Sequence, residues 1–269
     1  MANDNTGIAP GGEASDFAGC LARTNPSAGA LEQLRSQPDE TPVIMLNLLR
    51  FRPRGDASLY GLYVREAKPE IARLGSSVGY FGRRVTDIAT EPGLDDSWDA
   101  VALIVYPRRD SYLQLQESGA YQLAIPYRVA ATQRRNLYVL GDGSPLVPDA
   151  QTVADLDASH MGLTGTDTGL VTVELLRFTT DGREQYGEHL KACADALLSV
   201  GGQTLLSVDA EIPVLSDEYW HHCLLRHYPS RDALLSFYQS EDYRTAEKLR
   251  TASLEKSLCI ATESVSLPA

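Results

Sequence analysis

The sequence predicts an α+β protein in which two copies of one β-α-β-β-α-β unit close into a single barrel within the chain. Three observations support this prediction: a repeated block of residues, the same order of hydrophobic patterns in both halves, and a Gly/Pro-rich segment between them. The chain has 269 residues, which is enough to bury a large core.

The repeat is most evident in the segments that start at Trp98 and Trp220. A constant shift of 122 positions aligns the two segments without a gap. It pairs Trp98 with Trp220, Tyr106 with Tyr228, Tyr121 with Tyr243, and Arg128 with Arg250. Further upstream the shift becomes 126 or 127, and it pairs Asn47 with Glu174, Tyr60 with Tyr186, and Tyr63 with His189. The small length differences are expected in loops, where insertions are tolerated.

Each copy shows the same succession of patterns. A strand rich in Val, Ile and Leu comes first, and a helix with apolar residues at helical spacing follows and ends at a glycine. Two more strands, a second helical region and a last strand complete the unit. The expected strands are 43–51, 77–89, 98–106 and 136–140, then 170–178, 203–212, 219–228 and 257–265, and the expected first helices are 58–74 and 183–199. This order is the ferredoxin-like arrangement, and two such sheets can close on each other to remove their exposed edges.

The domain boundaries follow from these patterns. We expect a disordered N-terminus over residues 1–25 and a first repeat over 26–140, with a short helix near 27–36 at its start. A linker over 141–168 leads to the second repeat at 169–269.

Composition narrows the range of partners. Lys and Arg number 24 against 36 Asp and Glu, so the formal net charge is 24 − 36 = −12, which disfavours nucleic acid and anionic membranes. The sequence shows neither a secretory signal nor a membrane span, and its four cysteines lack ligand spacing, so we expect a cytoplasmic protein with reduced thiols. It is expected to be a monomer or a homodimer that binds a small molecule.

Several motifs resemble those of a known family. The first copy carries MLNLLRF, the helical Tyr63, a Trp-Asp strand opening, YPRRDSYLQL and AYQLAIPYR, and the second carries VELLRF, YPSRDALLSF and DYRTAEKLR. Over about residues 40–140 and 168–265 the chain resembles the dimeric α+β-barrel superfamily, and within it the family of domain of unknown function 1330 in tandem. The resemblance implies a pocket beside each sheet. The superfamily includes cofactor-free monooxygenases, haem-binding enzymes, isomerases and dehydratases, so the fold does not select a reaction.

Glu174 is the first candidate for chemistry. Strand alternation places it opposite the apolar Val173 and Leu175, in a strand that should be covered on both sides. It is either part of a salt bridge or a general base whose pKa burial raises. Asn47, its partner in the first copy, cannot titrate, so the second copy is the better candidate for proton transfer.

Two further groups could accompany Glu174. Tyr186 and His189 share a helix face, where a His–Glu pair would make a usable base, although a surface histidine explains the pattern as well. Arg250, which follows Tyr243, could hold a substrate oxyanion or fix the end of its helix.

The strand after Trp220 supplies the last candidates. His222 should share a face with Trp220, Arg226 and Tyr228, and that face could line a polar pocket, although Trp220 is also a candidate for core packing. A metal site is not expected, because neighbouring histidines point to opposite faces, and His221 and His227 lie about 20 Å apart at ~3.3 Å per residue.

The sequence leaves three hypotheses open. The first is a cofactor-independent enzyme that acts on a small carbonyl or hydroxy-aromatic metabolite by acid/base chemistry, as an isomerase, lyase or cyclase. In it Glu174, His189 and His222 are catalytic, and Tyr186, Trp220, Arg226, Tyr228, Tyr243 and Arg250 bind the substrate. The second is a non-catalytic small-molecule-binding or structural barrel. The third is a haem protein, with His189 as axial ligand, or a cofactor-free monooxygenase.

Overall fold

The structure is a computed structural model that describes residues 11–53, 57–86, 88, 94–155 and 169–266. Two helices come first, α1 (Gly11–Thr24) and α2 (Ala28–Arg35). The first half then contains β1 (Val43–Phe51), α3 (Ala57–Arg73), β2 (Ser77–Arg84), β3 (Ala100–Tyr106), α4 (Arg109–Glu117), α5 (Gly119–Ala131) and β4 (Thr132–Gly141). The second half contains β5 (Leu170–Phe178), α6 (Gly182–Ala192), α7 (Ala194–Ser199), β6 (Gln203–Leu215), β7 (His222–Tyr228), α8 (Arg231–Gln239), α9 (Glu241–Ser253) and β8 (Leu254–Ser264).

The strands form one closed barrel in the order β1-β3-β2-β8-β5-β7-β6-β4. Each half contributes four neighbouring antiparallel strands, and the pairs β2–β8 and β4–β6 join the halves. The β2–β8 seam is short, since it pairs residues 82–84 with residues 262–264. The predicted α+β fold class and the predicted β-α-β-β-α-β order in each half are therefore confirmed.

The barrel interior is a packed apolar core. Inward-pointing side chains of all eight strands form it, and Val171, Val173 and Leu175 of β5 belong to it. Glu174 lies between these residues in sequence and so points to the outer face, as the alternation predicted. The interior therefore stabilises the fold by burying apolar side chains of both halves.

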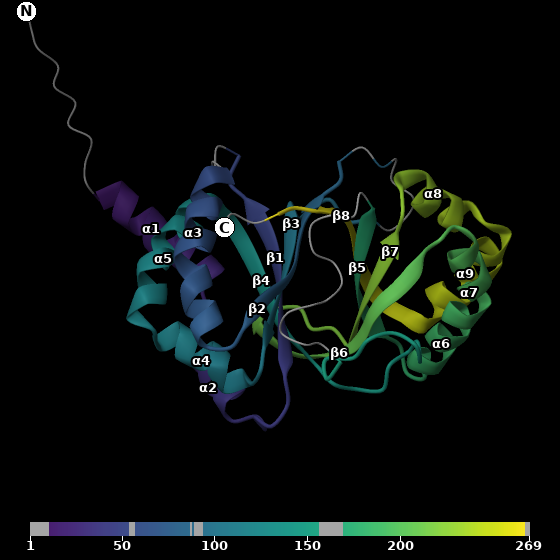
Figure 1. Ribbon diagram of the computed structural model, residues 1–269, viewed down its shortest axis with the longest axis horizontal. Coiled ribbons are helices and arrows are strands. Elements are labelled where there is room, and N and C mark those ends of the chain that lie inside the picture. Colours follow the sequence, from purple (N-terminus) through teal and green to yellow (C-terminus); the bar gives the residue numbers. More distant parts are fainter. Residues whose placement is uncertain (1–10, 54–56, 87, 89–93, 156–168, 267–269) are drawn as a thin grey trace, which may run out of the picture.

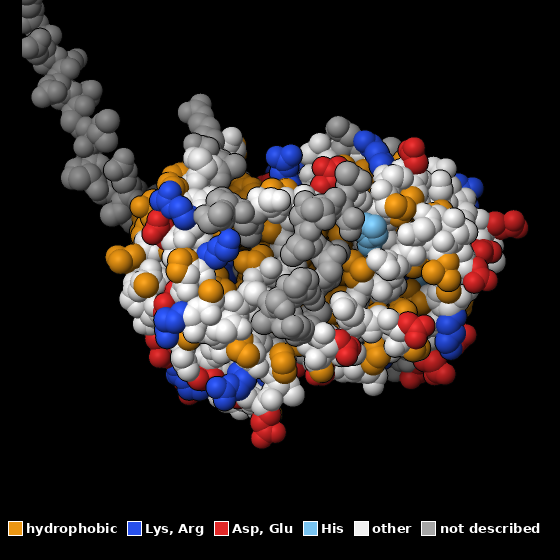
Figure 2. All heavy atoms as spheres, viewed as in Figure 1, with side chains coloured by type: hydrophobic (Ala, Val, Ile, Leu, Met, Phe, Trp, Pro, Cys, Tyr) orange, Lys and Arg blue, Asp and Glu red, His pale blue; other side chains and the backbone are white. Residues whose placement is uncertain are grey.

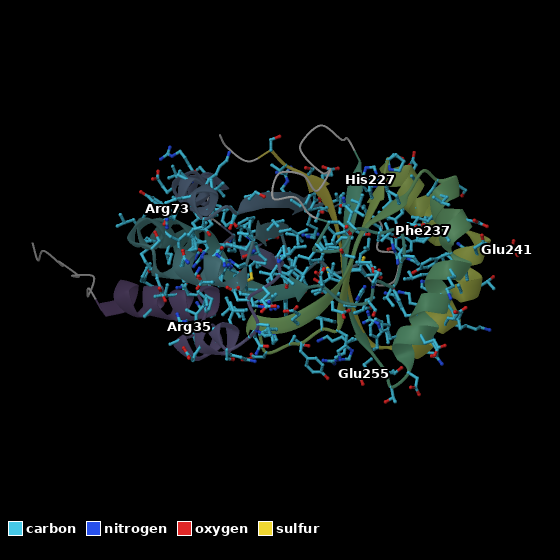
Figure 3. The ribbon with its side chains drawn as sticks, turned by 60° about the horizontal axis from the view of Figure 1, so that its bottom comes forward. Arg35, Arg73, His227, Phe237, Glu241 and Glu255 are labelled. Atoms are coloured by element: carbon cyan, nitrogen blue, oxygen red, sulfur yellow. The ribbon has the colours of Figure 1, made fainter. Side chains whose placement is uncertain are left out.

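The helices cover the outer faces of the two half-sheets at opposite ends of the molecule, α3 to α5 at one end and α6 to α9 at the other (Figure 1). Figure 3 labels Arg35 and Arg73 at the first end, and Phe237 and Glu241 at the second. Gly75 and Gly201 end the first helical region of each half with φ values of 69° and 72°, a conformation that glycine adopts readily and that the sequence predicted.

Serine breaks the second helical region of each half into two helices. Ser118 and Ser240 have extended backbones, and their hydroxyls accept hydrogen bonds from the backbone N–H groups of Tyr121 and Tyr243 at 3.5 and 3.2 Å. Such caps satisfy N–H groups that the first helical turn leaves unpaired. They place Tyr121 and Tyr243 at equivalent positions of α5 and α9.

The start of the chain differs from the prediction. Disorder over residues 1–25 is wrong for residues 11–24, which form α1, while residues 1–10 lie outside the described residues. Cys20 and Leu21 pack α1 against the first half, and Cys20 is buried. This segment has few apolar residues among many small and polar ones, so its sequence did not indicate a helix that packs against the barrel. Part of the predicted linker also lies against the barrel, since Gln151 bridges Leu206 and Val153 joins the interior core.

The surface is of mixed charge. On the face shown in Figure 2, acidic and basic side chains are scattered and do not gather into a basic patch. Within the described part of the chain, every helix is too short or too polar to cross a bilayer.

The short seam depends on a buried hydrogen bond. The hydroxyls of Tyr80 and Thr262 lie 2.6 Å apart, and Thr262 also donates to the carbonyl of Val171 at 2.9 Å. We predict that Thr262→Val lowers the free energy of unfolding by about 1–3 kcal/mol, because it leaves the Tyr80 hydroxyl buried without a partner. Urea unfolding measures the change. In the Tyr80→Phe background the same substitution should cost clearly less, and an equal cost in both backgrounds would contradict this explanation.

Candidate functional site

The two halves carry equivalent positions between the sheet and the helices. Asn47 of β1 lies opposite Ala102 of β3 and Leu137 of β4. Glu174 of β5 lies opposite Leu224 of β7 and Cys259 of β8, and each of these partners is 122 positions later than its counterpart. Asn47 and Glu174 are therefore structurally equivalent. We call Asn47, Tyr63, Tyr121, Arg128 and Arg135 the first-half site, and Glu174, Tyr186, His189, Arg226 and Arg250 the second-half site.

Glu174 is held by two arginines in the second-half site. Its carboxylate lies 3.4 Å from Nη2 of Arg226 and 3.4 Å from Nη2 of Arg250, and the Tyr186 hydroxyl donates to it at 3.2 Å. Glu174 and Arg226 are almost fully buried. Of the two explanations that the sequence left open, the geometry agrees with the salt bridge.

The other explanation, a general base whose pKa burial raises, does not fit the surroundings of Glu174. Burial by itself does raise that pKa, but the positive charges of Arg226 and Arg250 outweigh it and hold the pKa below its usual value. A carboxylate that stays ionised between two guanidiniums is a poor proton acceptor.

His189 does not form the predicted pair with Glu174. Its Nδ1 lies 3.1 Å from the carbonyl oxygen of Ala246, and its ring packs between Tyr186 and Tyr243 with centroid distances of 5.3 and 5.6 Å. Burial, followed by the charge of Arg226, lowers the pKa of His189 to about 4. The ring is 1% exposed, so a haem could approach it only by displacing its neighbours, and the position does not fit an axial ligand.

His222 belongs to a separate polar cluster. It is the first residue of β7 and lies opposite Leu176, two residues before Leu224, which faces Glu174. Its Nε2 lies 2.9 Å from the Ser207 hydroxyl, and its Nδ1 lies 2.8 Å from Oδ1 of Asp209. It is not brought together with the other candidates.

Two of the predicted binding residues face elsewhere or are packed. Trp220 joins the barrel interior, contrary to the predicted face shared with His222, because β7 begins at His222 and the bend before it breaks the alternation. Tyr228 is buried against the helices, where its ring lies 5.7 Å from that of Phe237. In the second half, the structure brings together Glu174, Tyr186, His189, Arg226 and Arg250, with Tyr243 beside His189.

The first-half site contains two buried arginines and a neutral amide. Arg135 of β4 donates to Oδ1 of Asn47 through Nε at 2.8 Å and through Nη2 at 2.6 Å. Arg128 of α5 donates to the Tyr121 hydroxyl at 2.8 Å and also bonds Oδ1 of Asn25, in the loop after α1. The Thr24 carbonyl at the end of α1 accepts from Arg135 at 3.2 Å. Helix α1 therefore closes one side of this site.

A narrow cavity of about 40 Å³ borders the first-half site. Its walls combine apolar side chains of α3 and the sheet with polar groups at one side. The polar residues of its lining are Asn47, Tyr60, Tyr63, Lys68, Tyr106, Tyr112, Tyr121 and Arg135. Among them, the Tyr112 hydroxyl is buried without a hydrogen-bond partner. A cavity with converging polar groups is where a small ligand is expected.

Tyr63 and Tyr121 contact each other, and their pKa values are shifted in opposite directions. Their hydroxyl oxygens lie 3.0 Å apart. Burial raises the pKa of both phenols. For Tyr121, the charges of Arg128 and Arg135 outweigh burial and lower the pKa below its usual value, whereas the pKa of Tyr63 stays well above it. Pairs of neighbouring groups whose pKa values are pushed apart are typical of acid/base sites.

The repeat does not indicate this site, because the decisive position differs between the two copies. Arg135 has Ser257 as its counterpart. In the second half the corresponding charge comes from Arg226, whose counterpart is Ile104. The signal that could have found the site is the run Thr-Gln-Arg-Arg before Asn136, at the start of a buried strand.

Among the described residues, no cluster of three or more His, Cys, Asp or Glu side chains could hold a metal ion.

Comparison with known proteins supports the fold. Residues 175–263 match the model of the family described as "Domain of unknown function (DUF1330)", as the motifs predicted. A protein of unknown function from Rhodopseudomonas palustris is 29% identical, with a TM-score of 0.41, over 46% of this chain and 98% of its own. No curated protein matches the chain.

Two solved structures span most of the barrel. An anthrone oxidase-like protein is 12% identical with a TM-score of 0.54, covering 85% of this chain and 92% of its own. A candidate chlorite dismutase is 13% identical with a TM-score of 0.52, covering 84% of this chain and 96% of its own. At these identities the likeness establishes the fold, and the predicted α+β barrel of the dimeric type is confirmed.

The ion cluster around Glu174 yields a stability prediction. Glu174→Gln should lower the free energy of unfolding by about 3–5 kcal/mol, because it leaves two buried guanidiniums without a counter-charge. Urea unfolding measures this loss. Glu255→Gln is the control, since Glu255 is 48% exposed where it pairs with Arg177 at 3.2 Å, and such a surface pair contributes about 0–1 kcal/mol. Equal effects of the two substitutions would contradict the prediction.

The pH dependence of stability should reflect His189. Its folded pKa of about 4 lies below the unfolded value of about 6.5, so the unfolded chain binds the proton first. Its contribution is complete above about pH 6.5 and should decline by roughly 3 kcal/mol as the pH falls toward 4. In urea unfolding across this window, His189→Asn should show a shallower decline than the wild type. A slope unchanged in His189→Asn would refute the assignment.

Proposed function

We propose that the protein is a cofactor-independent enzyme that acts on a small carbonyl or hydroxy-aromatic compound by proton transfer, and that the first-half site carries the reaction. The proposal rests on one observation above all. Tyr121 lines a cavity, contacts Tyr63 at 3.0 Å, and has its pKa lowered by Arg128 and Arg135.

The residues of the first-half site divide into roles. Tyr121 exchanges a proton with the substrate, because the two guanidiniums stabilise its phenolate form. Tyr63 stays protonated and donates a hydrogen bond. Arg135 lines the cavity and stabilises negative charge that develops on a substrate oxygen, and Asn47 holds the Arg135 guanidinium in place through two hydrogen bonds. Arg128 donates a hydrogen bond to the Tyr121 hydroxyl and acts by lowering the pKa of Tyr121.

The second-half site is less suited to this chemistry. The groups there that could accept a proton are weak bases, because two arginines keep Glu174 ionised and burial lowers the pKa of His189 to about 4. The proposal therefore moves the acid/base role from the second repeat, which the sequence favoured, to the first.

A non-catalytic binding protein is the principal rival, because the same cavity could hold a ligand without converting it. The two functions differ in whether a bound compound exchanges protons with solvent. Proton exchange is the minimal reaction of an acid/base enzyme, so it can be measured before the natural product is identified.

We predict that Tyr121 is the phenol with the lowest pKa in the protein. In a pH titration of tyrosinate absorbance, one tyrosine should ionise below the usual value of about 10, and Tyr121→Phe should remove that step. Tyr243→Phe is the matched control at the equivalent position of α9, where burial raises the pKa. A titration curve that Tyr121→Phe leaves unchanged would remove Tyr121 as the proposed base.

Activity is tested in deuterated buffer with a panel of small 1,3-dicarbonyl and hydroxy-aromatic compounds, followed by nuclear magnetic resonance. We expect exchange of a carbon-bound proton in at least one compound, and a loss of about 100-fold or more in Tyr121→Phe. Binding without exchange would support the non-catalytic rival, and oxygen-dependent products would support the monooxygenase alternative.

A further inference from the structure

Each half of the protein buries two guanidiniums between its sheet and its helices. They belong to Arg128 and Arg135 in the first half, and to Arg226 and Arg250 in the second. Arg128 and Arg250 are equivalent, while the second arginine comes from a different strand in each half. The two halves thus each place two guanidiniums between sheet and helices, but the second guanidinium comes from a different position in each half.

The halves differ in what neutralises this charge. In the second half Glu174 lies between both guanidiniums, at 3.4 Å from each. In the first half the equivalent residue is Asn47, a neutral amide. The other acceptors of Arg128 and Arg135 are the Tyr121 hydroxyl, the Asn25 amide and the Thr24 carbonyl, which carry no formal charge. Within the described parts of the chain, neither arginine forms an ion pair with a carboxylate.

The uncompensated positive charge of Arg128 and Arg135 lowers the stability of the fold unless an anion binds beside it. Buried charges are normally paired, because an unpaired charge loses hydration without compensation. Ionisation of Tyr121 would balance one of the two positive charges and would leave the other. One further negative charge is therefore expected from outside the chain.

The cavity offers groups that could receive this charge. Arg135 lines it and donates three hydrogen bonds to protein acceptors, whereas a guanidinium carries about five N–H donors. The Tyr112 hydroxyl, which also lines the cavity, is buried without a partner, and so is Nε of Arg128 behind it. These unsatisfied donors stand beside the uncompensated charge.

We infer that the first-half site binds the carboxylate of a small organic acid at Arg135 and Tyr112, and that Glu174 takes the place of this carboxylate in the second half. The inference rests on the proposed function for the location of the site and deepens it by naming the substrate class. The compound on which the enzyme acts carries a carboxylate in addition to its carbonyl or hydroxyl group.

Geometry and size favour a planar monocarboxylate. A guanidinium binds a carboxylate through two parallel hydrogen bonds, and the rings of Tyr60, Tyr63 and Tyr106 offer apolar faces to the rest of the molecule. The cavity of about 40 Å³ is narrow, so the remainder must be small or flat. Only one uncompensated positive charge remains when Tyr121 is ionised, which suits a single carboxylate better than a dianion.

Acetate is the probe, because a cavity of about 40 Å³ admits only a small acid, and isothermal titration calorimetry with the full-length protein is the measurement. We expect one acetate per chain, and at least tenfold weaker binding of acetamide, which has the same shape without the charge. Asn47→Glu, which gives the first half the carboxylate of the second, should abolish acetate binding. Leu123→Glu is the control, since it adds the same charge at a residue of α5 that is 79% exposed, and it should retain binding within about threefold.

Each outcome decides the inference. Equal binding of acetamide and acetate, no binding of either, or unchanged acetate binding in Asn47→Glu would overturn it. If Asn47→Glu does not fold, Arg135→Ser copies the second-half residue at the same position and should lose acetate binding at least tenfold. An equal loss of binding in Leu123→Glu and Asn47→Glu would also overturn it, because the effect would then be one of net charge.

Tyr121→Phe separates this inference from the proposed catalytic role. It removes the proposed base but leaves Arg135 and Tyr112 intact, so acetate should bind at least as tightly as to the wild type. Proton exchange lost in this variant with acetate binding kept supports both conclusions. Acetate binding without proton exchange in the wild type leaves the anion site standing and refutes only the catalytic proposal. Loss of acetate binding in Tyr121→Phe would count against the anion site.

Discussion

Closure of the barrel is the constraint on which the rest of the structure depends. A four-stranded sheet on its own would expose two edges and one apolar face to water. Here the two half-sheets pair at β2–β8 and β4–β6, and their inner faces share one packed core. Because that core takes the inward side chains of every strand, the outer faces are the only places where a strand can present a polar group to a helix. Both half-sites lie there for this reason, at opposite ends of the molecule (Figure 1).

The same architecture permits two ways of accommodating arginine side chains between the sheet and the helices. In the second half, Glu174 and two arginines form a cluster that is complete within the chain. In the first half, the equivalent amide of Asn47 orients Arg135 without cancelling its charge, and α1 supplies only neutral acceptors. The first solution gives a fixed, neutralised contact between sheet and helix. The second keeps positive charge beside a cavity, which is the arrangement that a binding site for an anion requires.

Much of the fold could be predicted from the sequence because it depends on local patterns. The strands 43–51 and 170–178 match β1 and β5, and the alternation along β5 assigned Glu174 to the face opposite Val173. What alternation cannot tell is where a strand begins, and so Trp220, which lies before the bend that precedes β7, was misplaced. The sequence left the ionisation of Glu174 open, since it suggests burial, whereas the contacts with Arg226 and Arg250 depend on tertiary structure. The role of Arg135 was missed because its contacts with Asn47 and Thr24 span 88 and 111 positions of chain.

The filled interior of the barrel has a consequence for how the two halves can change. Side chains of both half-sheets interlock there. The first-half site and the second-half site have no residue in common, and changes at sites without shared partners are expected to be additive in free energy. One half of the molecule can therefore accumulate changes in specificity while the other continues to secure the fold, an independence that a single symmetric domain could not provide.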